Sequence, residues 1–162
     1  MPMPSHLTLE GEKQGVINGS CEMQGRENSI LVYQMDHDIH MPIDPQSGLP
    51  SSKRIHGPLT ITKEFDKSSP MLYQALCAGE HMKKVTIKWY RISPQGAEEH
   101  YFTHVMENAI IVAIKPYVPV VFLKENEPYR QMEQVAFTYE KIKWTWEPDG
   151  IESEDSWKVP RA

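Results

Sequence analysis

Apolar and polar residues alternate along much of this chain, which is the pattern of β-strands. Between residues 29 and 41 odd positions carry apolar side chains such as Leu31, Tyr33 and Met35, whereas the even positions from Gln34 to His40 are polar. Residues 53–65 repeat the alternation. Successive side chains of a strand point to opposite faces, so each segment predicts a strand with one solvated face. We expect these two strands to pair with each other.

The second half of the chain predicts a hairpin. Residues 83–92 alternate, and the following Ser-Pro-Gln-Gly at 93–96 has the composition of a turn into a partner strand at 98–115. Within that partner, residues 109–114 are all apolar. A continuous apolar run is typical of a strand covered on both faces. A second subunit is one candidate cover.

Two features interrupt the simple alternation. Residues 131–146 predict the last strand, and its aromatic residues move from odd to even positions, which indicates a bulge near Lys141. Ser69 followed by proline predicts a helix over Pro70–Ala78, and Gly79 supplies its C-terminal stop.

The predicted helix has one narrow apolar face. Leu72, Ala75 and Leu76 fall at positions i, i+3 and i+4, so we expect this face to dock on a sheet or to contact a neighbouring subunit. About six strands and one short helix indicate a mainly β domain of barrel proportions. We assign this β-barrel of packed antiparallel sheets to residues 1–147 and expect the acidic residues 148–162 to form a loosely ordered tail.

Length and charge limit the classes of partner. A domain of 162 residues can bury about 70% of the surface that its unfolded chain exposes, so folding needs no cofactor. The 17 basic residues are scattered and 22 acidic residues outnumber them, which argues against nucleic-acid binding. No stretch approaches the roughly 18 apolar residues of a membrane span, so we expect no membrane insertion.

Compartment and thiol chemistry follow from the N-terminus and the cysteines. The start of the chain has no signal-peptide pattern, so we expect synthesis and folding in the cytoplasm. Cys21 and Cys77 form neither a C-x-x-C pair nor a disulfide framework. We therefore expect two reduced thiols that are not bonded to each other.

Candidate catalytic chemistry is sparse. Asp36, His40 and His56 are metal-ligand types, and a metal-dependent hydrolase that uses them is one alternative function. The alternation favours a solvated strand face instead, because the H-x-x-H spacing of His37 and His40 sends the two rings to opposite faces. The Glu98–His100 triplet follows a turn and favours a role in solubility. Nucleophile-elbow and phosphate-loop patterns are absent. We predict no enzyme, no catalytic or metal site and no cofactor.

The aromatic residues carry a second alternative, a monomeric ligand-binding β-barrel. Exposed rings can stack on sugars, but aromatic residues in β-proteins more often form packed pairs across neighbouring strands. We favour core packing for the set Trp89, Tyr90, Tyr139, Trp144 and Trp146.

One long segment carries a family resemblance. Residues 44–76 read DPQSGLPSSKRIHGPLTITKEFDKSSPMLYQAL, in which D-P-x-S-G-x-P joined to x-H-x-P-L is the specific part. This segment strongly resembles the haemolysin-coregulated proteins (Hcp), the tube subunits of type VI secretion systems. The similarity continues through the later strands, VTIKWYR from Val85 and FTYEKIKW from Phe137, and covers Leu7–Trp146.

The resemblance implies an assembly function. It implies a β-barrel with a flanking helix that closes into a homohexameric ring, and rings that stack into a tube exported without a signal peptide. It also implies three kinds of partner, namely the spike protein at the tip, the sheath proteins and the effector proteins carried in the lumen. One departure is Pro116–Leu123, which is more apolar than the polar connection expected there.

The proline-rich stretch at 42–52 is predicted to project from the barrel. Three prolines remove backbone donors and Gly48 permits a turn, so this segment cannot extend the hydrogen-bonded ladder of either neighbouring strand. The resemblance implies that it contacts the next ring, and we expect the ring-stacking residues to be Asp44, Pro45, Gln46, Ser47 and Gly48.

Overall fold

The computed structural model describes residues 2–157 and is mainly β, with a single α-helix among these residues. Its elements, in chain order, are β1 (Ser5–Gly11), β2 (Gly15–Ile17), β3 (Ile30–Val32), β4 (Gln34–Asp36), β5 (Ile39–His40), β6 (Ile55–His56), β7 (Leu59–Glu64), α1 (Ser69–Ala78), β8 (His81–Ile92), β9 (Glu98–Tyr117), the short 3-10 turn η1 (Lys124–Asn126), β10 (Met132–Thr138), β11 (Lys141–Trp146) and β12 (Ile151–Ser156). The predicted fold class, mainly β with one short flanking helix, is confirmed.

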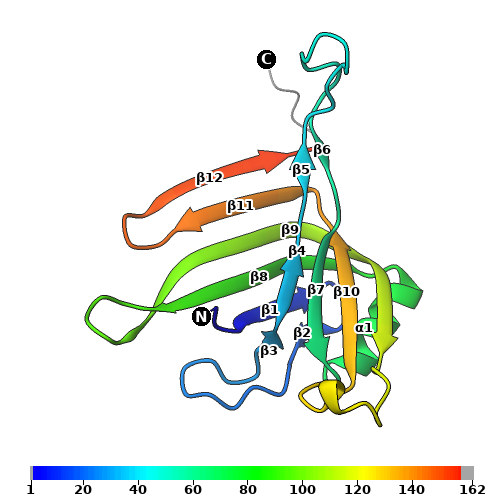
Figure 1. The fold of residues 1–162 in the computed structure, drawn as a ribbon, viewed down its shortest axis with the longest axis vertical. Coiled ribbons are helices and arrows are strands. Elements are labelled where there is room, and N and C mark those ends of the chain that lie inside the picture. The colour runs from blue at the N-terminus through cyan, green and yellow to red at the C-terminus, as the bar shows by residue number, and fades with distance from the viewer. Residues whose placement is uncertain (1, 158–162) are drawn as a thin grey trace.

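Ten strands form one antiparallel sheet. The order is β2-β1-β8-β9-β10-β7-β4, with β11 between β9 and β12 and with β3 beside β1. The sheet bends strongly around the core but does not close into a continuous barrel (Figure 1). Residues 30–36 bridge its two ends, because β3 pairs with β1 and β4 pairs with β7. The remaining two strands, β5 and β6, form a separate small sheet, which confirms the expected pairing of the 29–41 and 53–65 segments.

The longest strand explains why the predicted strand at 131–146 is divided. The 20-residue β9 pairs with β11 through its first half and with β10 through its second half. Between the two stretches Asn108 has a positive φ of 49°, a left-handed conformation that non-glycine residues seldom adopt. Its side-chain amide donates a 2.7 Å hydrogen bond to Glu140. The chain therefore breaks at residues 139–140 instead of forming a bulge near Lys141.

The core lies inside the bend of the sheet. Leu7, Ile87, Met106 and Phe137 are fully buried there, and Ile142 packs with them. They come from five strands that share the same apolar face, as the alternation predicts. No helix among residues 2–157 is long and apolar enough to cross a membrane.

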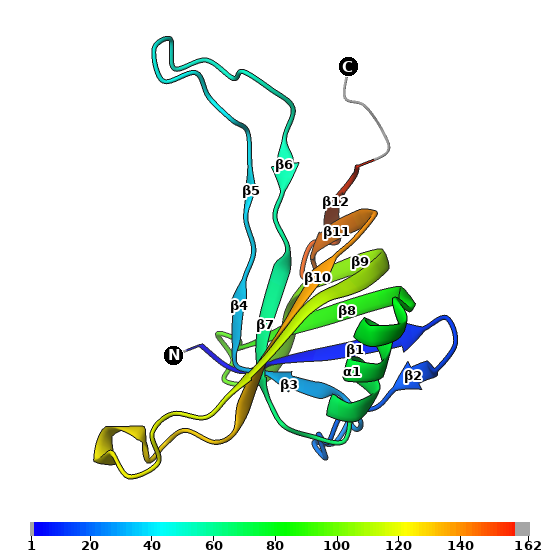
Figure 2. The same ribbon diagram turned by 90° about the vertical axis from the view of Figure 1, so that its right-hand side faces the viewer.

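Helix α1 lies beside β9 at one side of the sheet (Figure 2). It begins at Ser69, one residue earlier than predicted, and ends at Ala78 as predicted, before Gly79, whose φ of 64° permits the left-handed turn. The Ser69 hydroxyl does not cap the helix. It donates instead to Glu133 of β10 at 2.7 Å, so the first turn of the helix is fastened to the sheet.

The C-terminal stretch corrects the expectation of a loosely ordered tail after residue 147. Residues 151–156 form β12, which pairs along its whole length with β11. Lys141 contacts Glu154 at 3.0 Å and Lys143 contacts Glu152 at 3.7 Å. The acidic composition therefore reflects pairing with a basic neighbouring strand. Residues 158–162 of the predicted tail lie outside the described residues.

Candidate functional site

The loop between β5 and β6 projects far from the body of the domain. Figure 2 shows its two arms leaving the sheet side by side, with the tip at one end of the long axis of the molecule. Ile39 pairs with His56 and His40 with Ile55, and an isolated bridge joins Ile43 to Pro50 near the tip. The prediction that residues 42–52 project is therefore confirmed.

Hydrogen bonds around Asp44 shape the tip. One carboxylate oxygen accepts from the backbone N–H of Gln46 at 2.9 Å, and the other accepts from the Ser47 hydroxyl at 3.1 Å. The Gly48 N–H donates to the backbone oxygen of Asp44 at 2.8 Å, and Gly48 has a φ of 72°. The tip is thus a turn that the loop builds from its own polar groups. A turn of this kind is preorganised for docking.

Two apolar side chains at the tip were missed by the sequence analysis. Ile43 and Leu49 are 61% and 66% exposed, whereas the Asp44 and Ser47 side chains hold the loop itself. The signal was present in the sequence, because apolar residues in a segment that is predicted to project must be exposed. Exposed apolar residues indicate a contact surface. The tip therefore exposes apolar side chains, Ile43 and Leu49, together with polar ones such as Gln46.

A hydrogen-bonded network joins the base of both arms to the body. His37 precedes β5, and its Nε2 lies 2.9 Å from the Tyr139 hydroxyl. His56 in β6 places Nδ1 2.5 Å from the same hydroxyl and Nε2 2.7 Å from Asp155 of β12. Arg54 forms two hydrogen bonds to the Asp155 carboxylate, and the one from its terminal nitrogen measures 2.8 Å. Nothing in the alternation of the sequence identified Tyr139 or Asp155 as partners of these residues.

The structure does not assemble the alternative metal site. The His40 ring is exposed and pairs with Asp38 at 2.8 Å, whereas His56 is buried and bound to Tyr139 and Asp155. Asp36 is exposed at the end of β4. Among residues 2–157 no group of three acidic, histidine or cysteine side chains is placed to hold a metal ion.

The predicted apolar face of α1 serves the core of its own chain. Leu72 and Ala75 are 1% and 0% exposed, so their side chains are not available to a neighbouring subunit. Leu76 packs against the core but is only partly buried. The spacing i, i+3 and i+4 indicated an apolar face but could not distinguish these two uses.

The aromatic residues do not form one binding platform. Tyr139 is buried in the core, and Trp89 donates from its indole nitrogen to His104 Nδ1 at 2.9 Å. Burial lowers the pKa of His104 from 6.5 to about 4, in keeping with a neutral ring that accepts this bond. The Arg91 guanidinium lies over Tyr101 and Trp146, 4.8 and 5.0 Å from the ring centres.

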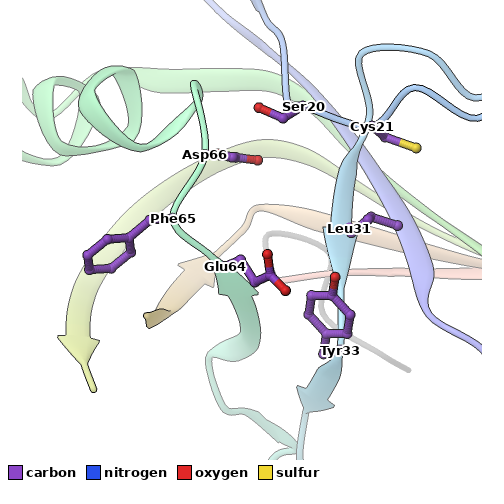
Figure 3. A pocket seen from close by; sticks show the side chains of 7 residues that line it. All are labelled: Ser20, Cys21, Leu31, Tyr33, Glu64, Phe65 and Asp66. Atoms are coloured by element: carbon purple, nitrogen blue, oxygen red, sulfur yellow. The ribbon is translucent and has the colours of Figure 1, made fainter. Parts of the chain in front are cut away.

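A small hollow lies where β3 and β4 meet the end of β7 (Figure 3). Its volume is about 150 Å³, and its lining includes Cys21, Tyr33 and Glu64. The Tyr33 hydroxyl faces the Glu64 carboxylate, and burial, with Glu64, raises the pKa of Tyr33. The thiol of Cys21 is buried, and both cysteines are free, as predicted. This hollow is too small for a drug-sized ligand.

A second exposed apolar segment lies at the opposite end of the molecule from the projecting loop. The connection between β9 and β10 occupies that end in both views of the ribbon. Val121 and Phe122 are 77% and 85% exposed there. The segment that departs from the expected polar connection therefore leaves the end of β9 and continues as a solvent-exposed loop directly before the short turn η1.

Comparisons with known proteins agree with this geometry. The family model described as "Type VI secretion system effector, Hcp" matches residues 6–146. The chain is 42% identical to the "Major exported protein" of Pseudomonas aeruginosa, with 100% of this chain and 99% of that protein covered. A crystal structure of an Hcp protein matches with a TM-score of 0.90 at 31% identity, covering 97% and 99% of the two chains. Hcp1 of an enteroaggregative E. coli strain matches with a TM-score of 0.84 at 37% identity, covering 96% and 99%.

Proposed function

The chain belongs to the Hcp family of type VI secretion proteins, and on that premise we propose that it forms hexameric rings which stack into the inner tube of the secretion machine. Members of this family are structural, secreted proteins and not enzymes. The observation that carries the proposal is the loop at residues 42–52, whose preorganised tip exposes two apolar side chains at one end of the molecule (Figure 2).

Stacking needs two different surfaces at opposite ends of the subunit. A contact between unlike surfaces at the two ends of a subunit can repeat along one axis without closing, which produces a tube instead of a dimer. The tip of the projecting loop supplies one such surface. We propose that Asp44, Pro45, Gln46, Ser47 and Gly48 form the ring-stacking turn, in which Asp44 sets the shape and Gln46 reaches the next ring. Ile43 and Leu49 add apolar contact area beside them.

Ring closure requires a further pair of surfaces around the side of the subunit. The apolar run at 109–114 supports one of them, because Ala109 and Ile111 face the core while Val112 remains 47% exposed on the outer face. Residues 2–157 of the same chain therefore do not supply the second cover expected for this run. We propose that a neighbouring subunit covers Val112, and that Leu76 is the one member of the predicted helix face still available for a subunit contact.

The partners follow from the role as a tube. We propose that the stacked rings contact the spike protein at the tip and the sheath proteins around them, and that effector proteins travel in the lumen. Synthesis in the cytoplasm and export to the medium or to a target cell belong to the same proposal.

A charge at the tip separates stacking from ring formation. We expect Leu49→Arg to leave rings intact and to prevent tubes, because the substitution places a charge in an apolar contact. Ser52→Arg adds the same charge to an exposed position of one arm and is the matched control. Sedimentation and negative-stain electron microscopy of both variants provide the measurement. Normal tubes from Leu49→Arg would show that the tip does not stack, and a monomeric parent protein would exclude the ring itself.

A further inference from the structure

The network at the base of the projecting loop is a single chain of hydrogen bonds. It runs from Arg54 through Asp155, His56 and Tyr139 to His37. Both arms of the loop contribute, and the body contributes one residue from the β10–β11 junction and one from β12. Burial is high along the chain, with 2% exposure for the His56 side chain, 9% for Asp155 and 6% for Tyr139. This chain, together with the 2.9 Å hydrogen bond from Arg54 to the Ser156 carbonyl, links the loop to the body.

The direction of each hydrogen bond follows from the chemistry of its ends. Hydrogen bonds from Arg54 lower the pKa of Asp155, so this carboxylate is ionised and only accepts. His56 must therefore donate from Nε2 to Asp155. A neutral His56 then accepts at Nδ1, and the Tyr139 hydroxyl is the donor. The one proton of Tyr139 is thereby used, so His37 must donate from Nε2 to the Tyr139 oxygen.

The chain tolerates one additional proton but not two. If His56 is protonated, its Nδ1 donates to Tyr139, and the hydroxyl turns to donate to His37, which then carries its proton on Nδ1. If both rings are protonated, both donate to Tyr139, and the hydroxyl proton has no acceptor in the chain. Two imidazolium groups would then lie against one oxygen atom, at 2.9 and 2.5 Å. Like charges so close repel each other strongly in a buried site.

The surrounding groups set the pH at which the second proton binds. Burial lowers the pKa of His37 from 6.5, His56 lowers it further, and Asp38 on the same arm raises it. His104 of β9 faces His37, and the Trp157 ring lies 4.8 Å from the ring of His56. Burial also raises the pKa of Tyr139, so its hydroxyl keeps its proton. His37 therefore takes up its additional proton below the ordinary pKa of an imidazole.

We propose that Tyr139 and its two histidines position the projecting loop for stacking, and that protonation of both rings releases it. The inference rests on the proposed stacking role of the loop. At neutral pH the arms are fixed to the body and the tip is presented in one orientation. In mildly acidic solution the arms detach, rings separate from each other, and the body of the subunit stays folded.

Hydrogen exchange measured by mass spectrometry on unstacked rings tests the release directly. After correction for intrinsic exchange rates, we expect the backbone amides of residues 38–56 to be protected about tenfold less at about pH 5 than at about pH 7.5. A tenfold loss corresponds to about 1.4 kcal/mol, which is the contribution of one hydrogen bond. Strands β8 and β9 should stay protected. Tyr139→Phe should show the loosened arms at both pH values, whereas Tyr129→Phe, at an exposed tyrosine outside the network, should match the parent protein.

A second variant keeps the proposal testable if Tyr139→Phe fails to fold. The amide of His37→Gln donates to Tyr139 as the neutral ring does but cannot be protonated. Its arms should therefore remain protected at about pH 5. Arms of the parent protein that are equally protected at both pH values, or His37→Gln arms that loosen like the parent's, would overturn the inference. If the arms lose protection at about pH 5 but tubes persist at that pH, protonation does release the loop, and the proposed stacking role of the loop is wrong.

Discussion

Removing the carboxylate of Glu133 should destabilise the domain, because it leaves a buried lysine short of its nearest counter-charge. Lys63 is 0% exposed and Glu133 is 1% exposed, with their charged atoms 2.5 Å apart. Lys63 also contacts Asp66 at 3.0 Å and the Ser69 hydroxyl at 3.1 Å. Breaking a buried ion pair by deleting one partner costs about 3 to 5 kcal/mol. Asp66 still offsets part of the Lys63 charge, so we expect Glu133→Ala to lower the free energy of unfolding by about 3 kcal/mol.

The pair itself contributes much less than this figure. Burial of both charges is costly, and Glu133 Oε2 has no hydrogen-bond partner among the described residues. Replacing a buried ion pair by apolar residues of similar volume is often neutral or stabilising. We therefore expect the double variant Lys63→Met with Glu133→Leu to lie within about 1 kcal/mol of the parent, well below the cost of Glu133→Ala alone.

Urea unfolding at fixed protein concentration and in one oligomeric state measures these differences, because assembly adds to apparent stability. Glu133→Gln, which keeps an acceptor for Lys63 and the Ser69 hydroxyl, should fall between the parent and Glu133→Ala. A cost below about 1 kcal/mol for Glu133→Ala, or a double variant as unstable as the sum of the two single variants, would refute the reasoning.

Three further predictions concern a histidine, the helix and the thiols. The folded-state pKa of His104 is about 4 against 6.5 for an ordinary imidazole, so the unfolded chain binds the proton more tightly and stability falls as pH drops from about 6.5 towards 4, by up to about 3 kcal/mol. Urea unfolding across that range should show the loss, and His104→Gln should flatten it. Leu72→Asp should prevent folding, since an unpaired buried carboxylate and a lost core side chain together cost more than about 4 kcal/mol, whereas circular dichroism of Gln74→Asp on the exposed face should be unchanged. Cys21 and Cys77 are free, so reductant should not shift the melting temperature, and a lower value with reductant would indicate an unexpected disulfide.

The alternation of residues was sufficient for the strands that have one apolar face. The pairing of β5 with β6, the β8–β9 hairpin and the helix ending at Gly79 follow from local patterns, because burial of one face imposes a period of two and a left-handed turn favours glycine. Alternation does not identify strands that are polar on both faces. Residues 151–156 read as an acidic tail, yet they form β12, because Lys141 and Lys143 on the neighbouring strand offset their charge.

The sequence by itself determined the family, the mainly β class and the projecting loop. A stretch rich in proline cannot continue a ladder of backbone hydrogen bonds, whatever surrounds it. Only the tertiary structure decided that Leu72 and Ala75 pack into their own core, and that His56 meets Tyr139 and Asp155 instead of a metal. These partners lie 83 and 99 residues away along the chain. A local pattern states which face of an element is apolar or polar, but what lies against that face depends on how distant segments fold together.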